Sequence, residues 1–379
     1  MKPLIIGNLK VRVPIVQGGM GVGVSLSGLA SAVANRGGIG VISAVGLGMN
    51  YDTKGKYSKQ ANIDSFRKEI RKAKKLSPKG VLGANIMLAV TNFDELFKVA
   101  IDEKLDIVFV GAGLFIHKPT TVTAEEFLNS NTKFVPKISS ARAAKLTLKV
   151  WADKFGRLPD ALAIEGSKAG GHLGFKKNEL IKGTQSLHNI VRETKIIVSE
   201  YEKEFGVKIP IIAGGGIYDG IDIYKIFKAG ADAVKMGTKF VTTFECDADI
   251  KFKEQYLNIN KPKDIVLIDS PAGLPGRAVN NDFLKSVASG EQKPVKCAWQ
   301  CLKTCNYKNV SYCIAEALFN AANGNLENGF AFAGTNAYKA DKIQTVKEVF
   351  DELISEFKYI SNKNRNYKKT YDYAVCVSA

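Results

Sequence analysis

Short runs of apolar residues alternate with segments of helical periodicity from the N-terminal region to about residue 245. Each run is continuously apolar, which is typical of parallel strands that helices cover on the outside. The intervening segments, such as 27–38 and 140–156, carry apolar residues at helical spacing, and several end in glycine, a common helix stop signal. The predicted strands are residues 14–17, 40–43, 81–86, 107–111, 134–138, 161–165, 210–214 and 233–237.

Eight strand–helix units within about 245 residues match the size and rhythm of a TIM barrel, so we predict an α/β fold of the (β/α)8 class. The alternative is a doubly wound parallel sheet, which should carry the spacing GxGxxG after its first strand. After the first predicted strand the chain reads GGMGVGVS, which does not fit that spacing. The barrel is therefore the preferred interpretation.

The strand–helix rhythm ends near residue 246. Residues 246–333 are rich in turn-forming residues and show no convincing strand–helix pair, so we expect an inserted cap region over the mouth of the barrel. Residues 335–357 return to helical spacing. We therefore expect a barrel at 1–245, a cap or substrate region at 246–333, and a segment at 334–379 whose helix packs back on the barrel.

The chain of 379 residues has 54 Lys and Arg against 37 Asp and Glu, and a formal net charge of +17. The lysines are scattered through every segment, which indicates solvated surface charge more than a nucleic-acid site or an anionic substrate. No apolar run approaches the ~20 residues of a membrane span, and the N-terminal apolar run is too short for a signal peptide. We expect a cytoplasmic protein that binds neither nucleic acid nor membrane.

Cys297, Cys301 and Cys305 recur at every fourth residue, and Cys313 follows. This spacing predicts one face of a helix and differs from the CxxC of common zinc and iron–sulfur sites. In a cytosolic chain these thiols should be reduced. We interpret them as small buried apolar residues and expect no metal, with a metal cluster or a redox role as less favoured alternatives.

Three of the predicted strands end in polar side chains, and the active sites of such barrels lie at these carboxyl ends. Asn85, Lys137 and Glu165 supply an amide, an ammonium and a carboxylate. Such a set suits a heterocycle whose edges both donate and accept hydrogen bonds. The alternative is that Lys137 pairs with Glu165 only to balance charge.

Glycine-rich loops follow the first, seventh and eighth predicted strands. Gly19 and Gly21 flank Met20 and leave room for a flat ligand. The other two loops offer backbone N–H groups to a phosphate, helped by the dipole of a helix expected to begin near Tyr218. A phosphorylated, planar cofactor with polar edges is therefore expected, and flavin mononucleotide (FMN) fits. The residues of the two phosphate loops are Gly214, Gly215, Gly216, Gly237 and Thr238.

One of only three histidines, His172, stands in the segment EGSKAGGHLGF, directly after two glycines. A glycine pair is typical of a place where another group approaches the main chain closely. Histidine can serve as a general base or, when protonated, as an electrostatic stabiliser. A structural hydrogen-bonding role for His172 is the alternative, and His117 and His188 are interpreted as ordinary surface or loop residues.

The chain resembles the nitronate monooxygenase (2-nitropropane dioxygenase-like) family of FMN-dependent barrels, which also includes flavin-dependent enoyl-ACP reductases. The resemblance covers roughly residues 10–245 and rests on PIVQGGMG, Asn85, Lys137, AGGH and PIIAGGGIYDG…GADAVKMGTKF. It implies that His172 is the active-site histidine. It also implies that FMN contacts Gly19, Met20, Gly21, Asn85, Lys137, Glu165, Ala169, Gly170, Gly171, Gly214, Gly215, Gly216, Gly237 and Thr238.

The activity that the resemblance favours is oxidation of an alkyl nitronate by O2 through a flavin semiquinone. A positive His172, helped by Lys168, would hold the nitronate and the anionic semiquinone; the family often has Glu at the position of Lys168, which leaves the substrate open. The alternative is an enoyl-ACP (enoyl-thioester) reductase that uses NAD(P)H, for which the basic surface would suit an acyl carrier protein. A non-catalytic FMN-binding module is less favoured, and a homodimer is compatible with each of these functions.

Overall fold

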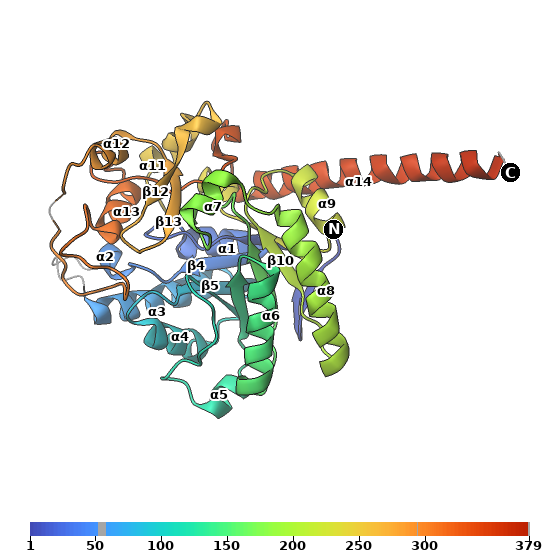
Figure 1. The fold of residues 1–379 in the computed structure, drawn as a ribbon, viewed down its shortest axis with the longest axis horizontal. Coiled ribbons are helices and arrows are strands. Elements are labelled where there is room, and N and C mark those ends of the chain that lie inside the picture. Colours follow the sequence, from blue (N-terminus) through green and yellow to red (C-terminus); the bar gives the residue numbers. More distant parts are fainter. Residues whose placement is uncertain (52–57, 294, 378–379) are drawn as a thin grey trace.

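The computed structural model of the protein describes residues 1–51, 58–293 and 295–377, with side chains up to residue 364. Its centre is a closed barrel of parallel strands in the order β10-β11-β3-β4-β5-β6-β7-β8 (Figure 1). All eight strands predicted from the sequence are present, so the predicted (β/α)8 fold is confirmed. The strands are β3 (Ile15–Gln17), β4 (Ile39–Ser43), β5 (Val81–Met87), β6 (Ile107–Gly111), β7 (Lys133–Ile138), β8 (Leu162–Glu165), β10 (Ile211–Gly214) and β11 (Ala233–Met236).

Alternate strand residues point into the barrel and toward the surrounding helices. Interior side chains such as Val41, Phe109 and Ile212 are completely buried and form one apolar cluster. A hairpin that the sequence did not predict, β1 (Leu4–Ile6) and β2 (Leu9–Val11), adds its buried residues to the same cluster. The barrel interior is therefore a packed core.

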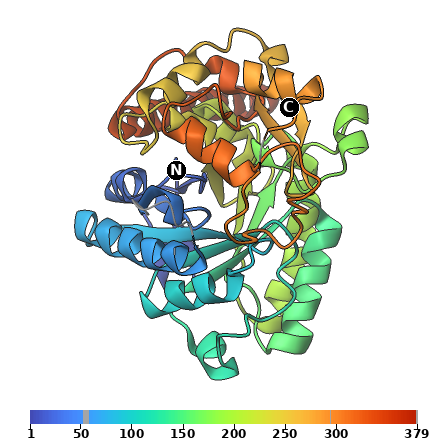
Figure 2. The same cartoon turned by 90° about the vertical axis from the view of Figure 1, so that its left-hand side faces the viewer.

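Helices cover the outside of the barrel (Figures 1 and 2). Several begin after a serine whose hydroxyl accepts a backbone N–H of the first turn, for example Ser140 and Ser186. No helix in the described ranges is long and apolar enough to cross a membrane. The helices up to residue 241 are α1 (Ser27–Asn35), α2 (Gly48–Tyr51), α3 (Lys59–Leu76), α4 (Phe93–Asp102), α5 (Ala124–Asn129), α6 (Ala141–Val150) with a π-helical continuation η1 (Trp151–Phe155), α7 (Lys177–Lys182), α8 (Leu187–Phe205), α9 (Gly220–Lys228) and α10 (Thr238–Val241).

The described residues between 246 and 333 form a hairpin and three α-helices, which gather on one side of the barrel (Figures 1 and 2). The hairpin strand β13 also pairs with β9 (Gly171–His172), which lies in the loop after β8. The cap and the loop that carries His172 are thus joined in one three-stranded antiparallel sheet. The elements of this region are α11 (Ile250–Leu257), the 3-10 turn η2 (Pro262–Asp264), β12 (Ile265–Asp269), β13 (Pro275–Val279), α12 (Asp282–Ala288) and α13 (Ile314–Ala322).

The helix predicted for the cysteine segment is wrong: residues 295–313 are turns and extended chain. Leu302 forms an isolated bridge with Val90 in the loop after β5. The carbonyl of Cys301 accepts the Thr91 N–H at 3.0 Å, and the N–H of Lys303 reaches the carbonyl of residue 89 at 2.8 Å. Because these backbone groups pair across to another segment, they are not available for helical hydrogen bonds.

The C-terminal helix α14 (Val346–Val377) packs on α9, and its distal part projects from the barrel (Figure 1). The sequence predicted a helix at 335–357, whereas the structure has turns and a short 3-10 segment, η3 (Ala337–Lys339), before α14 begins. Reciprocal hydrogen bonds between Thr345 and Glu348 explain this start, because each side chain accepts the other residue's backbone N–H.

Candidate active site

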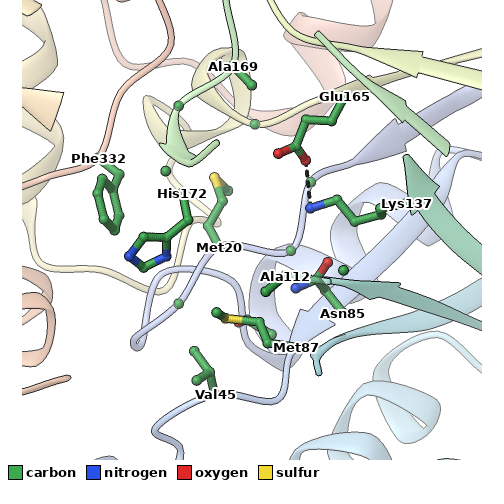
Figure 3. Close-up of a pocket in the computed structure, with 18 of the residues that line it drawn as sticks. Met20, Val45, Asn85, Met87, Ala112, Lys137, Glu165, Ala169, His172 and Phe332 are labelled. Atoms are coloured by element: carbon green, nitrogen blue, oxygen red, sulfur yellow. Dashed lines mark ion pairs between the residues drawn. The ribbon is translucent and has the colours of Figure 1, made fainter. Parts of the chain in front are cut away.

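A cavity of about 730 Å³ lies at the carboxyl ends of the barrel strands, between these ends and residues 246–333. Barrel loops line one side, and Trp299, Leu318 and Phe332 line the other. In the view of Figure 3, Met20 lies between His172 and the charged pair Lys137 and Glu165. The structure brings all the residues predicted for the site to this one cavity; their roles in binding remain predictions. They are Gly19, Met20, Gly21, Asn85, Lys137, Glu165, Ala169, Gly170, Gly171, His172, Gly214, Gly215, Gly216, Gly237 and Thr238, with Lys168 beside them.

Three ionisable side chains form the floor of this cavity above the apolar core of the barrel. Lys137 Nζ lies 2.6 Å from Glu165 Oε2 (Figure 3). Lys235, on β11, also lines the cavity, and its Nζ lies 5.0 Å from the centroid of the Phe109 ring in the barrel interior. Sequence reasoning missed Lys235, although a lysine inside the apolar strand AVKMG was a usable signal.

The floor has more positive than negative groups. Burial raises the pKa of Glu165, but attraction from Lys137 and Lys235 outweighs it, so the pKa lies below its ordinary value and the carboxylate is ionised. Burial, followed by repulsion from Lys137, lowers the pKa of Lys235 to about 7, against the opposing attraction of Glu165. One carboxylate therefore interacts with two amines. An anion that enters the cavity would favour the protonated form of Lys235.

Asn85 adds an unsatisfied hydrogen-bonding atom to the floor. Its side chain is buried, and its Oδ1 has no hydrogen-bond partner in the described part of the chain. A buried amide oxygen without a donor is costly. A ligand with an N–H group on its edge would satisfy this atom.

The first glycine-rich loop packs against the floor. A Cβ at Gly19 would lie 2.4 Å from Cβ of Asn85, and one at Gly21 would lie 2.3 Å from Cγ1 of Val45. These glycines are therefore explained by close packing, whereas the sequence had suggested room for a flat ligand. Met20 lies between them and reaches the cavity (Figure 3).

The loops after β10 and β11 present free backbone donors. Gly215 and Gly216 have φ angles of 106° and 80°, which favour glycine. Across the ranges 1–51, 58–293 and 295–377, no hydrogen bond is recorded for the backbone N–H of Gly215, Gly216 or Thr238. Free N–H groups on two neighbouring loops that line one cavity are suited to an anion such as a phosphate.

The helix after the β10 loop begins two residues later than predicted, and carboxylates of the chain cap it. Helix α9 begins at Gly220, and the Asp219 carboxylate accepts the Asp222 N–H at 2.8 Å. The Glu356 carboxylate, on α14, accepts the Gly220 N–H at 2.7 Å. Carboxylates thus already occupy these N–H groups, and the contribution of the helix dipole to a ligand stays a prediction.

The two glycines before His172 have different structural reasons. A Cβ at Gly170 would lie 2.5 Å from the carbonyl carbon of Ala333 and 2.6 Å from the nitrogen of Gly334, so backbone from the end of the cap approaches here. Gly171 has a φ of 80° and open space where a Cβ would lie. The close approach expected at Gly170 is real, and the chain itself accounts for it.

His172 is held by the cap and is neutral. Its Nε2 lies 2.7 Å from Ser270 Oγ, and its ring centroid lies 5.0 Å from that of Phe332. Burial lowers the pKa of His172 to about 4, against the opposing effect of Glu165. The prediction of a positive charge on this ring is therefore wrong for neutral pH. The lysines of the floor supply the positive charge of the site.

Sequence reasoning also missed the cap residues that hold the loop after β8. Arg277, on β13, donates from Nη1 to the carbonyls of Ser167 and Ala169, the latter at 2.7 Å. Ser270 and Arg277 are about 100 residues away from their partners along the chain. No local pattern could reveal these contacts.

The cysteine segment borders the site. Cys301 lines the main cavity and an adjoining one of about 20 Å³, which Cys297, Cys305 and Cys313 also line. Burial raises the pKa of Cys301 to about 12, so this thiol is protonated. Among the described residues, no group of three or more His, Cys, Asp or Glu side chains is arranged to hold a metal ion.

We predict that the His172 ring stays neutral between about pH 5 and 8, because its pKa of about 4 lies below the ordinary value of 6.5. The unfolded chain binds the additional proton first, so this group lowers the free energy of unfolding as the pH falls from about 6.5 toward 4. Nuclear magnetic resonance of ring nitrogens in the ¹⁵N-histidine-labelled protein measures the titration. A midpoint near 6.5 for His172 would contradict the prediction.

Comparison with known proteins assigns the chain to a family. The profile of the family described as nitronate monooxygenase matches residues 2–356. A probable nitronate monooxygenase of Staphylococcus aureus is 26% identical over 311 residues, which cover 75% of this chain and 79% of that protein. A Mycobacterium tuberculosis protein named (3aS,4S,5R,7aS)-5-hydroxy-7a-methyl-1-oxo-octahydro-1H-indene-4-carboxyl-CoA dehydrogenase is 24% identical over 279 residues, 74% of this chain and 66% of that protein.

Solved structures of other proteins have the same fold as this chain. The structure of FabK from Thermotoga maritima has a TM-score of 0.72 and 27% identity, and the match covers 94% of this chain and 96% of that chain. A nitroalkane oxidase from Streptomyces ansochromogenes has the same fold, with a TM-score of 0.69, 20% identity, and coverage of 93% and 98%. Because the family profile spans nearly the whole chain, the protein belongs to the nitronate monooxygenase family.

Proposed function

We propose that the protein is an FMN-dependent nitronate monooxygenase that oxidises alkyl nitronates with O2. The observation that carries this proposal is the cavity floor, where the carboxylate of Glu165 pairs with Lys137 and also attracts Lys235. A buried site with this excess of cations stabilises negative charge, which both a nitronate and an electron-rich ring system carry. The neutral His172 lies elsewhere on the wall of the same cavity and adds hydrogen bonding without charge.

The residues of the cavity fit FMN. Membership of the family implies a flavin cofactor. The free N–H groups of Gly215, Gly216 and Thr238 would hold the phosphate, and Asn85 Oδ1 would accept a ring N–H. The two glycine-rich loops form a single phosphate site, and the sequence indicates no adenine site, which favours FMN over FAD. When bound, the flavin supplies the electron-transfer chemistry of the site.

The protein's own residues position the substrate and limit its exposure to water. Lys235 would attract the nitronate, and its charge would rise as the anion approaches. Phe332, in edge contact with His172, covers one side of the cavity (Figure 3). A partly enclosed, less polar site strengthens these electrostatic interactions.

A second candidate is reduction of an enoyl thioester with NAD(P)H. Met87, Leu302, Ile314 and Leu318 give part of the cavity an apolar lining that suits an acyl chain. The likeness to FabK and to a relative named as a carboxyl-CoA dehydrogenase also supports a thioester substrate. An acyl carrier protein would be the partner suited to the basic surface.

Anaerobic mixing of the flavin-loaded protein with propionate 3-nitronate, and separately with NADH and NADPH, distinguishes the two candidates. The proposed function predicts that the nitronate alone bleaches the flavin absorbance, and that O2 restores it. Rapid bleaching by a nicotinamide, with none by the nitronate, would replace the proposal with the thioester reductase. Absence of both reactions would contradict both candidates.

We predict that Gly215→Ala lowers FMN affinity. A Cβ there would lie 2.8 Å from the Gly166 carbonyl oxygen, and the φ of 106° is unfavourable for alanine. The loop must shift or strain by about 1–3 kcal/mol, which corresponds to about 5–150-fold in the dissociation constant. Fluorescence titration of the flavin-free protein with FMN measures the effect.

Gly183→Ala is the matched control for this variant. Gly183 has a similar φ of 104°, but a Cβ there would meet nothing within 4 Å, and the residue does not line the cavity. This variant should bind FMN like the parent. Equal FMN affinity in Gly215→Ala and Gly183→Ala would mean that the β10 loop is only a turn.

A further inference from the structure

The hydrogen bond between His172 and Ser270 joins the loop after β8 to the cap. Ser270 follows β12 in the hairpin turn, and His172 lies on β9, which pairs with the other hairpin strand, β13. The 2.7 Å distance joins Nε2 of the ring to the serine Oγ. The cap thus holds one of the two ring nitrogens.

The turn fixes the position of the serine oxygen. The Ser270 N–H donates to the Leu274 carbonyl at 3.4 Å, and the Ser270 carbonyl accepts the Gly273 N–H at 2.9 Å. Ser270 Oγ itself accepts the Ala272 N–H at 3.2 Å. Ser270 is buried, so water does not readily replace these contacts.

A count of donors and acceptors decides which atom carries the proton in this hydrogen bond. A hydroxyl has one hydrogen to donate, and a buried hydroxyl normally donates it. In the residues that the structure describes, the only acceptor recorded near that hydrogen is Nε2 of His172. If Nε2 carried the ring proton instead, the serine hydrogen would be left without an acceptor.

The second ring nitrogen is the one available to a ligand. A neutral imidazole has one N–H, so an unprotonated Nε2 places the proton on Nδ1. Within the described residues, Nδ1 has no hydrogen-bond partner, and His172 lines the cavity. The charged groups that act on the ring are Glu165 on β8 and Lys137 on β7; burial nevertheless keeps the ring neutral.

We propose that Ser270 is a positioning residue that holds His172 as the Nδ1–H tautomer, so that His172 presents a hydrogen-bond donor to its substrate. The group that it recognises is an acceptor, such as a nitronate oxygen or a thioester carbonyl oxygen. His172 then stabilises that oxygen and does not remove a proton. This catalytic consequence rests on the proposed function, whereas the tautomer does not.

Nuclear magnetic resonance tests the tautomer without any substrate. The chain has three histidines, so ¹⁵N-histidine labelling of the flavin-loaded protein, with His117→Gln and His188→Gln for assignment, resolves the ring nitrogens of His172. We expect a protonated Nδ1 and an unprotonated Nε2 in the parent. Ser270→Ala should lose this preference, and Ser270→Thr should keep it. A protonated Nε2 in the parent, or an unchanged tautomer in Ser270→Ala, would overturn the proposal.

Turnover of propionate 3-nitronate tests the consequence. Ser270→Ala should lower kcat/KM about tenfold, the size of one hydrogen bond's contribution, while Ser270→Thr stays near the parent. Ser289→Ala changes an exposed serine directly after α12 and is the control; its kcat/KM should match that of the parent. Parent-like turnover in Ser270→Ala despite an altered tautomer would overturn the catalytic part. A parent protein that does not turn over the nitronate would contradict the proposed function. The tautomer measurement would then still decide whether Ser270 positions His172.

Discussion

The interaction between Glu165 and the two lysines of the cavity floor is the constraint on which the site depends. Strand alternation places these side chains in the last interior layer of the barrel, above an apolar core that contains Phe109. Burying charges there is costly unless they are paired. Lys137 pairs with Glu165, but Lys235 leaves a surplus of positive charge. The site is thus prepared for a ligand that is anionic or becomes so.

The cap completes this site by holding one loop at three points. Arg277 holds the carbonyls of Ser167 and Ala169, Ser270 holds His172, and the backbone at Ala333 packs on Gly170. The barrel therefore supplies charge, and the cap fixes the histidine opposite it. This division explains why the loop after β8 continues into a strand of the cap sheet.

Local patterns predicted the barrel well, because continuous apolar runs directly reflect strands that are buried on both faces. The residues that they predicted for the site lie together in one cavity, since strand ends share one face of a barrel. They failed where distant segments decide the outcome: the cysteine segment forms turns that pair with Thr91, and burial makes His172 neutral. Ser270 and Lys235 were missed, the first because its contact is non-local and the second because its strand was interpreted as purely apolar.

The reduction potential of the bound flavin tests most directly whether the floor stabilises negative charge. Lys235→Met removes the surplus cation, so the midpoint potential should become more negative by on the order of 50 mV at pH 6.5, because reduction adds negative charge to the ring. Lys145→Met, which removes an exposed lysine of α6, should leave the potential unchanged. An equal potential in Lys235→Met and the parent, with flavin fully bound in both, would contradict the account.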